Sequence, residues 1–252
     1  MRPILFSVFG VNVYGYGTMI AIGILSAVIL LGYRAKQRGY NEDHIFNMSV
    51  IAVISGIIGG KLLFIITEMT SIINDPSILK DIGNGFVIYG AVIGGAAAVY
   101  FYSRRKKWNT LKVFDMVIPT VALAQGFGRI GCFFAGCCYG RETALPIGVE
   151  FTNSLFAPPN IIRYPTQIFS SCFDFLLALF LLWYDRKNHK EGRTFALYLI
   201  IYSIGRFLVE FLRGDPRGNV GALSTSQFIS IFVFIAGIIL FNIHLIWKRT
   251  ED

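Results

Sequence analysis

Seven apolar stretches, each long enough to cross a lipid bilayer, constrain this chain more than any other feature. A transmembrane helix needs about 20 consecutive, mostly apolar residues. Hydrophobic residues make up 54% of the 252 residues and charged residues only 15%, which is too little charge to cover a soluble protein of this length. The sequence therefore predicts an all-α polytopic membrane protein with seven transmembrane helices in a single domain, residues 1–252. The expected spans are 13–33, 45–67, 85–103, 112–134, 165–184, 194–212 and 225–247.

The positive charges fall mainly in the short loops between these spans. The formal net charge is +8, and this placement indicates membrane topology and no nucleic-acid partner. Of the 23 lysines and arginines, 14 follow spans one, three, five and seven, 6 lie on the other side, and 3 lie within spans. The positive-inside rule then predicts the N-terminus outside and the C-terminus in the cytoplasm, which agrees with an odd number of spans.

Small residues recur at helical spacing in spans two, three and four. Small-xxx-small patterns let helix backbones approach closely in lipid, where no hydrophobic effect drives helices together. We therefore expect spans two to four to pack tightly. The residues concerned are Ser55, Gly56, Gly59, Gly60, Gly90, Gly94, Gly95, Gly126, Gly128 and Gly131.

Five ionisable residues stand out inside the expected spans, where a charged side chain at mid-span costs at least about 2.5–3.5 kcal/mol on insertion. They are Lys61, Arg129, Asp174, Arg206 and Glu210. Asp174 has no evident partner, and Lys61 either pairs with it or extends to the membrane surface.

Arg206 and Glu210 are four residues apart in YSIGRFLVEFLR and share a helix face. Arg213, three residues beyond Glu210, would continue this face to the bilayer surface and bind an anionic lipid headgroup. The alternative is a structural ion pair between Arg206 and Glu210 without further function.

Arg129 is the most informative of the buried charges. Its guanidinium is always charged, and its planar shape suits a phosphate. Arg129 and Arg206, from different spans, could clamp one phosphate, with Glu210 orienting a guanidinium. The alternative is that Arg129 extends to the outer membrane surface.

Three cysteines follow Arg129 within ten positions: Cys132, Cys137 and Cys138. Packing, a disulfide among themselves or with Cys172, and a reactive thiol near Arg129 all remain open. Adjacent cysteines lack the C-x2-C spacing typical of zinc sites and no histidine is near, so no metal site and no cofactor are expected.

The tyrosines add polar groups near the expected outer surface. Tyr202 lies four residues before Arg206 and therefore shares its helix face. Tyr16 and Tyr89 occur in the glycine-rich segments VYGYG and VIYGAVIGG. Tyrosines at a membrane interface are common, so anchoring is the alternative for each of them.

Together these segments resemble the bacterial prolipoprotein diacylglyceryl transferase family over nearly the whole chain. The matching segments are VYGYGTM, IGGKLLF, YGAVIGG, GRIGCFFAGCCYGR, YPTQIF and YSIGRFLVEFLR. The resemblance implies a multi-pass enzyme of the bacterial cytoplasmic (inner) membrane that transfers a diacylglyceryl group from phosphatidylglycerol to the lipobox cysteine of a prolipoprotein signal peptide. A thioether forms and glycerol phosphate leaves.

The resemblance also implies roles for individual residues. The family's signature arginine falls on Arg129, which would bind substrate together with Tyr16 and the basic Arg213 noted above. The catalytic group would comprise Arg206, Glu210 and Tyr202. Tyr89 stands where the family usually has a histidine and would join the catalytic group as a weak acid–base residue. The only histidines of the chain are His44, His189 and His244. All lie at cytoplasmic ends of spans or in a cytoplasmic loop, so none would act as a base at an outer site.

The chain departs from the family pattern in its signature, which usually reads G-R-x-G-N-F-x-N-x-E-x-x-G. Here Cys132 and Ala135 replace the two asparagines and Cys137 replaces the glutamate. These replacements leave three alternatives open: a different acceptor, a non-catalytic lipid-binding protein, or a thiol-redox membrane protein.

Overall fold

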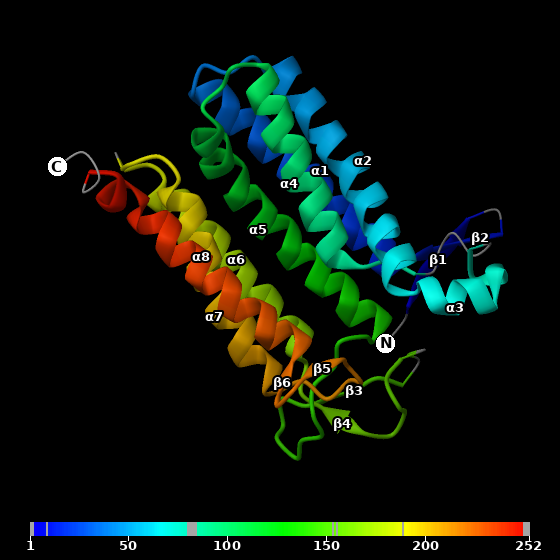
Figure 1. The fold of residues 1–252 in the computed structure, drawn as a ribbon. Coiled ribbons are helices and arrows are strands. Elements are labelled where there is room, and N and C mark those ends of the chain that lie inside the picture. The colour runs from blue at the N-terminus through cyan, green and yellow to red at the C-terminus, as the bar shows by residue number, and fades with distance from the viewer. Residues whose placement is uncertain are drawn as a thin grey trace. The chain divides into compact units, whose positions relative to one another are not determined.

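The computed structural model describes residues 3–8, 10–79, 85–152, 154, 156–187 and 189–248. It divides into two compact units: Leu31–Phe114, and Met1–Leu30 together with Asp115–Asp252. Two long helices, α1 (Gly15–Gln37) and α5 (Thr110–Ala135), begin in one unit and end in the other. Most of the described chain is helical, as the apolar stretches predict (Figure 1).

Two glycine-lined helices form the centre of the unit Leu31–Phe114. Its elements are the end of α1, α2 (Glu42–Thr67), α3 (Met69–Asn74), the 3-10 helix η1 (Pro76–Leu79), α4 (Ile88–Arg105) and the start of α5. A Cβ atom on Gly90 would overlap the carbonyl oxygen of Gly59, and one on Gly94 would overlap that of Ser55. The close approach predicted for spans two and three is therefore confirmed for α2 and α4.

Replacing Gly90 with alanine should force α2 and α4 apart and destabilise the protein. Overpacking of this kind typically costs about 1–3 kcal/mol. Gly95→Ala is the matched control, since its Cβ would lie 3.5 Å from the Ala52 oxygen, an ordinary contact. Thermal unfolding in detergent should show a lower Tm for Gly90→Ala only; equal Tm values would refute the close packing.

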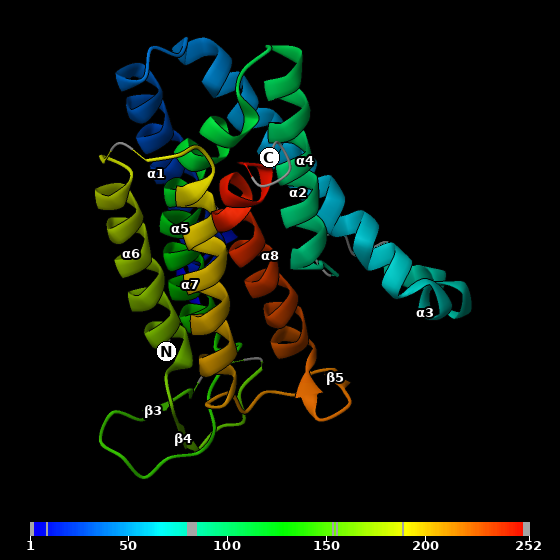
Figure 2. The ribbon, with the colours of Figure 1, turned by 60° about the vertical axis from the view of Figure 1, so that its left-hand side comes forward.

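The other unit is a helical bundle that holds the candidate site. Its main helices are the remainder of α5, α6 (Thr166–Tyr184), α7 (Arg193–Glu210) and α8 (Thr225–Lys248). Helices α6, α7 and α8 run side by side in both views (Figures 1 and 2). Buried apolar side chains of α5, α6 and α7 form one cluster: Ile118, Ala122, Leu177, Ala178, Leu181 and Tyr198.

Side chains of α5 accept hydrogen bonds that fix its position against α7. The Asp115 carboxylate accepts bonds from the backbone N–H groups of Gly192 and Phe195 at 2.6 and 2.8 Å, so it caps the start of α7. Near the middle of the bundle, the Tyr198 hydroxyl donates to the Gln125 side chain at 2.8 Å. Such bonds hold buried polar groups without leaving them unsatisfied.

Three short antiparallel hairpins were not predicted from the sequence. They are β1 (Ile4–Val8) with β2 (Val11–Tyr14), β3 (Val149–Glu150) with β4 (Ile162–Arg163), and β5 (Asn219–Val220) with β6 (Leu223–Ser224). The last two hairpins lie at the end of the bundle where α5 and α7 finish and α6 and α8 begin (Figure 2). The strands of these two hairpins are only two residues long, which is too short to show a clear strand pattern in the sequence.

In the part of the chain that the structure describes, five helices are long and apolar enough to cross a membrane: α1, α2, α5, α6 and α8. Large apolar side chains such as Ile29, Phe101 and Leu176 are exposed, as expected for surfaces that face lipid. The expected spans 85–103 and 194–212 correspond to α4 and α7, which have similar lengths but a more polar composition. The protein is therefore a helical multi-pass membrane protein.

Candidate active site

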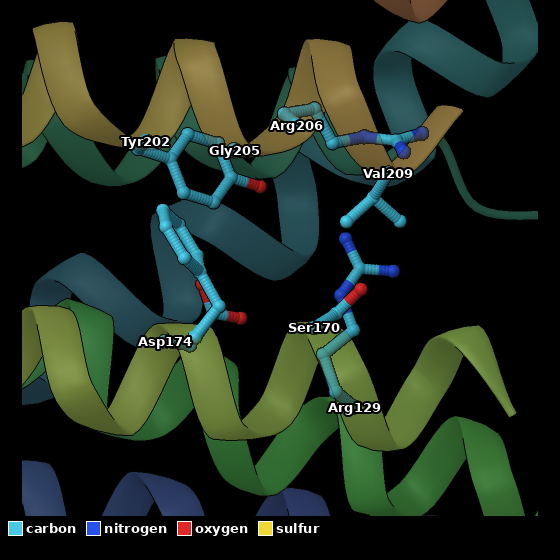
Figure 3. A pocket seen from close by; sticks show the side chains of 8 residues that line it. Arg129, Ser170, Asp174, Tyr202, Gly205, Arg206 and Val209 are labelled. Carbon is cyan, nitrogen blue, oxygen red and sulfur yellow. The ribbon is translucent and has the colours of Figure 1, made fainter. Parts of the chain in front are cut away.

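A small pocket opens among α5, α6 and α7, and two arginines from different helices line it. The full lining is Arg129, Ser170, Phe173, Asp174, Tyr202, Gly205, Arg206 and Val209. Arg129 extends from α5 past α6 toward Val209 of α7, while Asp174 and Tyr202 face the pocket from opposite sides (Figure 3). The structure therefore brings together three residues that the sequence predicted for the site: Arg129, Tyr202 and Arg206.

Arg129 differs from the other arginines of this region because its charge is uncompensated by direct contact. Among the residues that the structure describes, none forms a hydrogen bond or ion pair with its guanidinium, although Asp174 and Tyr202 lie close enough to interact electrostatically. A guanidinium with five free donors that lines a pocket is suited to bind a phosphate group.

Arg206 is held in a fixed orientation by two partners. Its Nη1 donates to Glu210 Oε2 at 2.7 Å, and its Nη2 donates to Ser226 Oγ of α8 at 2.8 Å. Glu210 is buried, and its other oxygen forms an ion pair with Arg217. Glu210 therefore orients two guanidinium groups, one more than the sequence predicted.

Arg213 does not continue the helix face of Arg206 and Glu210, contrary to the prediction. Helix α7 ends at Glu210, and the chain then turns. The Arg213 guanidinium donates twice to the Asp215 carboxylate, at 2.9 and 2.6 Å. Burial lowers the pKa of Arg213, but the hydrogen bonds to Asp215 and the nearby Cys138 raise it, and the net shift is upward. If Arg213 binds a lipid headgroup, it does so with a guanidinium that is already paired with Asp215.

Asp174 is the residue whose position the sequence left open, and the structure places it in the pocket. Its side chain is 2% exposed and lies near both Arg129 and Arg206. Tyr202 forms the opposite wall, stacked on Tyr198 with ring centroids 5.3 Å apart. The sequence does not show how one helix is rotated about its axis relative to another. The proximity of Asp174 to these arginines therefore became evident only from the fold.

Two predicted tyrosines occupy different surroundings. Tyr16, in the first turn of α1, contacts Gly131 of α5 and lies near Arg129 and the cysteines. Tyr89 belongs to α4, in the unit Leu31–Phe114, as does Lys61, which lies 6.0 Å from the ring centroid of Phe64. The role of Tyr89 stays a prediction.

The three cysteines after Arg129 converge, as a disulfide among themselves, one of the alternatives left open by the sequence, would require. The Sγ atoms of Cys132, Cys137 and Cys138 all lie within 4.8 Å of one another. All three are unbonded thiols, and Cys172, on α6, is exposed and unbonded. The sequence hypothesis of a disulfide between Cys172 and the others therefore has no support in the described structure.

A sharp turn after α5 produces this convergence. Gly136 and Cys138 both have positive φ values, +70° and +61°. A left-handed conformation costs a non-glycine residue about 1–2 kcal/mol, so the surroundings must hold Cys138 in place. Thr166 Oγ1 donates to the Cys138 carbonyl and Gln167 Nε2 to the Cys137 carbonyl, each at 2.7 Å. Both bonds come from the buried start of α6.

The pKa values of the Cys137 and Cys138 thiols are shifted in opposite directions. Hydrogen bonds from the thiols of Cys132 and Cys137 lower the pKa of Cys138, and the positive charges of Arg213 and Arg129 lower it further, against the effect of burial. Hydrogen bonding with the same two neighbours raises the pKa of Cys137. Cys138 is therefore the thiol beyond the end of α5 that ionises most readily.

Comparison with known proteins shows the family of the chain. A family described as "Prolipoprotein diacylglyceryl transferase" matches residues 3–243. The chain belongs to the prolipoprotein diacylglyceryl transferase family. A phosphatidylglycerol–prolipoprotein diacylglyceryl transferase of Clostridium tetani is 68% identical over 99% of this chain and 100% of its own length.

Other relatives extend the comparison. The protein named phosphatidylglycerol–prolipoprotein diacylglyceryl transferase 2 of Clostridium perfringens is 58% identical over the whole chain and 98% of its own length. A relative from Clostridioides difficile with the same transferase name is 33% identical over 95% of this chain and 94% of its own length. The resemblance found from the motifs is therefore confirmed, and this member of the diacylglyceryl transferase family is a transferase.

Two further residues complete the charge network of the transferase and were missed in the sequence. Arg217 and Asp215 lie in the turn after α7, where RGDPRG alternates charge with glycine and proline. Arg217 pairs with Glu210, and Asp215 pairs with Arg213. The high density of charged residues in this short segment could have indicated a role in the site. Which residues pair with each other depends on how the turn after α7 folds back.

Proposed function

We propose that this chain transfers the diacylglyceryl group of phosphatidylglycerol to the thiol of a prolipoprotein lipobox cysteine. The observation that carries the proposal is the unpaired guanidinium of Arg129, beside the oriented guanidinium of Arg206, in a pocket between three helices. Family membership and the names of the relatives support the same substrates.

The reaction requires stabilisation of an anionic leaving group. The acceptor sulfur forms a bond to the glycerol carbon that carries the phosphate ester. The carbon–oxygen bond to that phosphate breaks, its electron pair leaves with glycerol phosphate, and the thiol proton passes to water. Arg129 would bind the phosphate oxygens as negative charge develops there, which is the kind of fixed electrostatic contact that lowers such barriers most.

Arg206 would supply the second positive contact of this phosphate clamp. Its two bonds to Glu210 and Ser226 keep the side chain in one rotamer, so little reorganisation is needed when substrate binds. Tyr202 and Asp174 would line the headgroup pocket, while Tyr16 and Arg213 would lie toward the acceptor. We assign no step to Tyr89 beyond the weak acid–base role that its replacement of the family histidine suggests.

In this proposal the chain crosses the membrane seven times. Helices α4 and α7 cross the bilayer in addition to the five more apolar helices. The charge distribution supports an outside N-terminus and a cytoplasmic C-terminus in the bacterial cytoplasmic (inner) membrane. This orientation puts the pocket, the cysteines and the turn after α7 in the outer part of the bilayer, where secreted prolipoproteins emerge.

Complementation tests the proposal in a living cell. A bacterial strain depleted of its own diacylglyceryl transferase should regain growth and lipoprotein modification when it expresses this chain. An inserted, folded protein that restores neither would contradict the proposal and favour another acceptor or a non-catalytic lipid-binding role. Thiol labelling before and after reduction addresses the redox alternative, which requires a reversible change in accessible cysteines.

A further inference from the structure

We propose that Cys132, Cys137 and Cys138 bind one Zn²⁺ ion through their three sulfur atoms and leave its fourth position open for the acceptor cysteine. The metal site rests on geometry alone. Its use in binding the acceptor thiol rests on the proposed function.

The sulfur geometry is close to that of a three-cysteine zinc site. Zinc–sulfur bonds of about 2.3 Å in a tetrahedron place sulfur atoms about 3.8 Å apart. The three Sγ atoms lie within 4.8 Å of one another, so side-chain movements of about 1 Å suffice to close the site. Thiolates are soft ligands that select zinc over the hard cations magnesium and calcium.

The backbone supports this geometry at a position where it would otherwise be unfavourable. Neighbouring residues in an extended chain point in opposite directions, so the side chains of Cys137 and Cys138 would not normally bind the same metal ion. The positive φ values at Gly136 and Cys138 remove that alternation. A Cβ on Gly136 would overlap Ser154, whose hydroxyl lies 3.2 Å from the carbonyl oxygens of both Ala135 and Gly136.

Helix α6 holds the same turn from the other side. The side chains of Thr166 and Gln167, both buried, donate to the carbonyls of Cys138 and Cys137. These bonds fix the ligand backbone in advance, as a second layer of contacts does around many metal sites. A strained turn held by several hydrogen bonds is typical of a site whose geometry has a function.

The surrounding charges suit an anionic metal–thiolate group. Zn²⁺ with three thiolates carries a net charge of −1, and an acceptor thiolate makes it −2. Arg213 and Arg129 both interact electrostatically with Cys138 and would offset this charge. Without such partners the charge would be costly at this depth in the membrane.

The position of the cluster also suits the proposed reaction. Cys132 follows Arg129 by three residues, so the two side chains share a face of α5. A thiolate in the open position would lie about one helical turn from a phosphate bound at Arg129. Zinc lowers the pKa of a bound thiol and keeps the resulting thiolate nucleophilic. That role would take the place of the family's histidine, which Tyr89 replaces in this chain.

Metal analysis of the full-length protein, purified in detergent without added chelator, tests the site itself. We expect about one zinc per chain in the wild type and in the control Cys172→Ser, and about a fifth of that or less in Cys137→Ser and Cys138→Ser. Circular dichroism would show whether each variant is folded. Wild-type protein stripped with a chelator and reloaded with zinc gives the same information without substitution.

Three results would overturn the metal site: wild-type protein without zinc, copper in place of zinc, or zinc that is unchanged in the cysteine variants. Mass spectrometry that finds a disulfide among these three cysteines would do the same.

Cobalt replacement tests the open fourth position. The Co²⁺-loaded protein should show thiolate-to-cobalt charge-transfer absorption that grows on addition of a lipobox peptide and is unchanged by the same peptide with serine for cysteine. Equal responses to both peptides would overturn thiol binding while leaving the metal site intact. A protein that binds zinc and peptide thiol but transfers no diacylglyceryl group would instead contradict the proposed function.

Discussion

Arg129→Ala should lower the rate of diacylglyceryl transfer at least about 100-fold, the typical loss when one contact to a developing negative charge is removed. The membrane insertion and Tm of the variant should stay close to those of the wild type, because Arg129 has no hydrogen bond or ion pair with any residue that the structure describes. The measurement is the initial rate of glycerol phosphate release from phosphatidylglycerol in the presence of a lipobox peptide.

Two further variants make this prediction specific. Arg129→Lys keeps the positive charge but not the planar fork of donors, so we expect activity between those of the wild type and Arg129→Ala. Arg186→Ala removes an exposed arginine that follows α6 and should leave the rate unchanged. Wild-type transfer by Arg129→Ala would eliminate the phosphate-clamp mechanism.

Glu210→Ala should cause the largest loss of stability among single substitutions in the site. It would leave Arg206 and Arg217 facing each other without their shared carboxylate, and breaking a buried ion pair costs about 3–5 kcal/mol. For a protein of this size the Tm should fall by about 10 °C or more. Thermal unfolding in detergent measures the shift.

A double-variant comparison distinguishes this network from general packing. Glu210→Gln together with Arg217→Gln removes one charge of each sign, so the combined loss should be smaller than the sum of the two single losses. The exposed Glu150→Gln should leave the Tm unchanged. Additive losses for the pair, or a stable Glu210→Ala variant, would show that Glu210 does not hold these arginines.

The helices and part of the site follow directly from the sequence. Apolar stretches of membrane length locate the long helices, and the spacing of Arg206 and Glu210 correctly predicts their ion pair within one helix. Glycines in spans two and three correctly predict a close helix pair. The glycines of span four instead contact other neighbours: Gly126 packs against Phe175 of α6 and Gly131 against Tyr16 of α1.

Features that depend on turns and on helix rotation could not be predicted in this way. The sequence predicted that the helix continues through Arg213, but α7 ends at Glu210, because the sequence does not mark where the last helical turn ends. The pairing of Arg217 with Glu210 was missed for the same reason, since it depends on the turn that follows the end of α7. Asp174 reaches the arginines only through the rotation of α6, and the three cysteines converge only through left-handed residues at the turn after α5.

The most direct test of the whole account is mass spectrometry of a lipobox peptide incubated with the purified protein and phosphatidylglycerol. We predict that the cysteine gains one diacylglyceryl group, that glycerol phosphate is released in equal amount, and that the new bond resists hydroxylamine, as a thioether does. A peptide that stays unmodified, or one whose modification hydroxylamine removes as a thioester, would contradict transfer by carbon–oxygen bond cleavage at the phosphate.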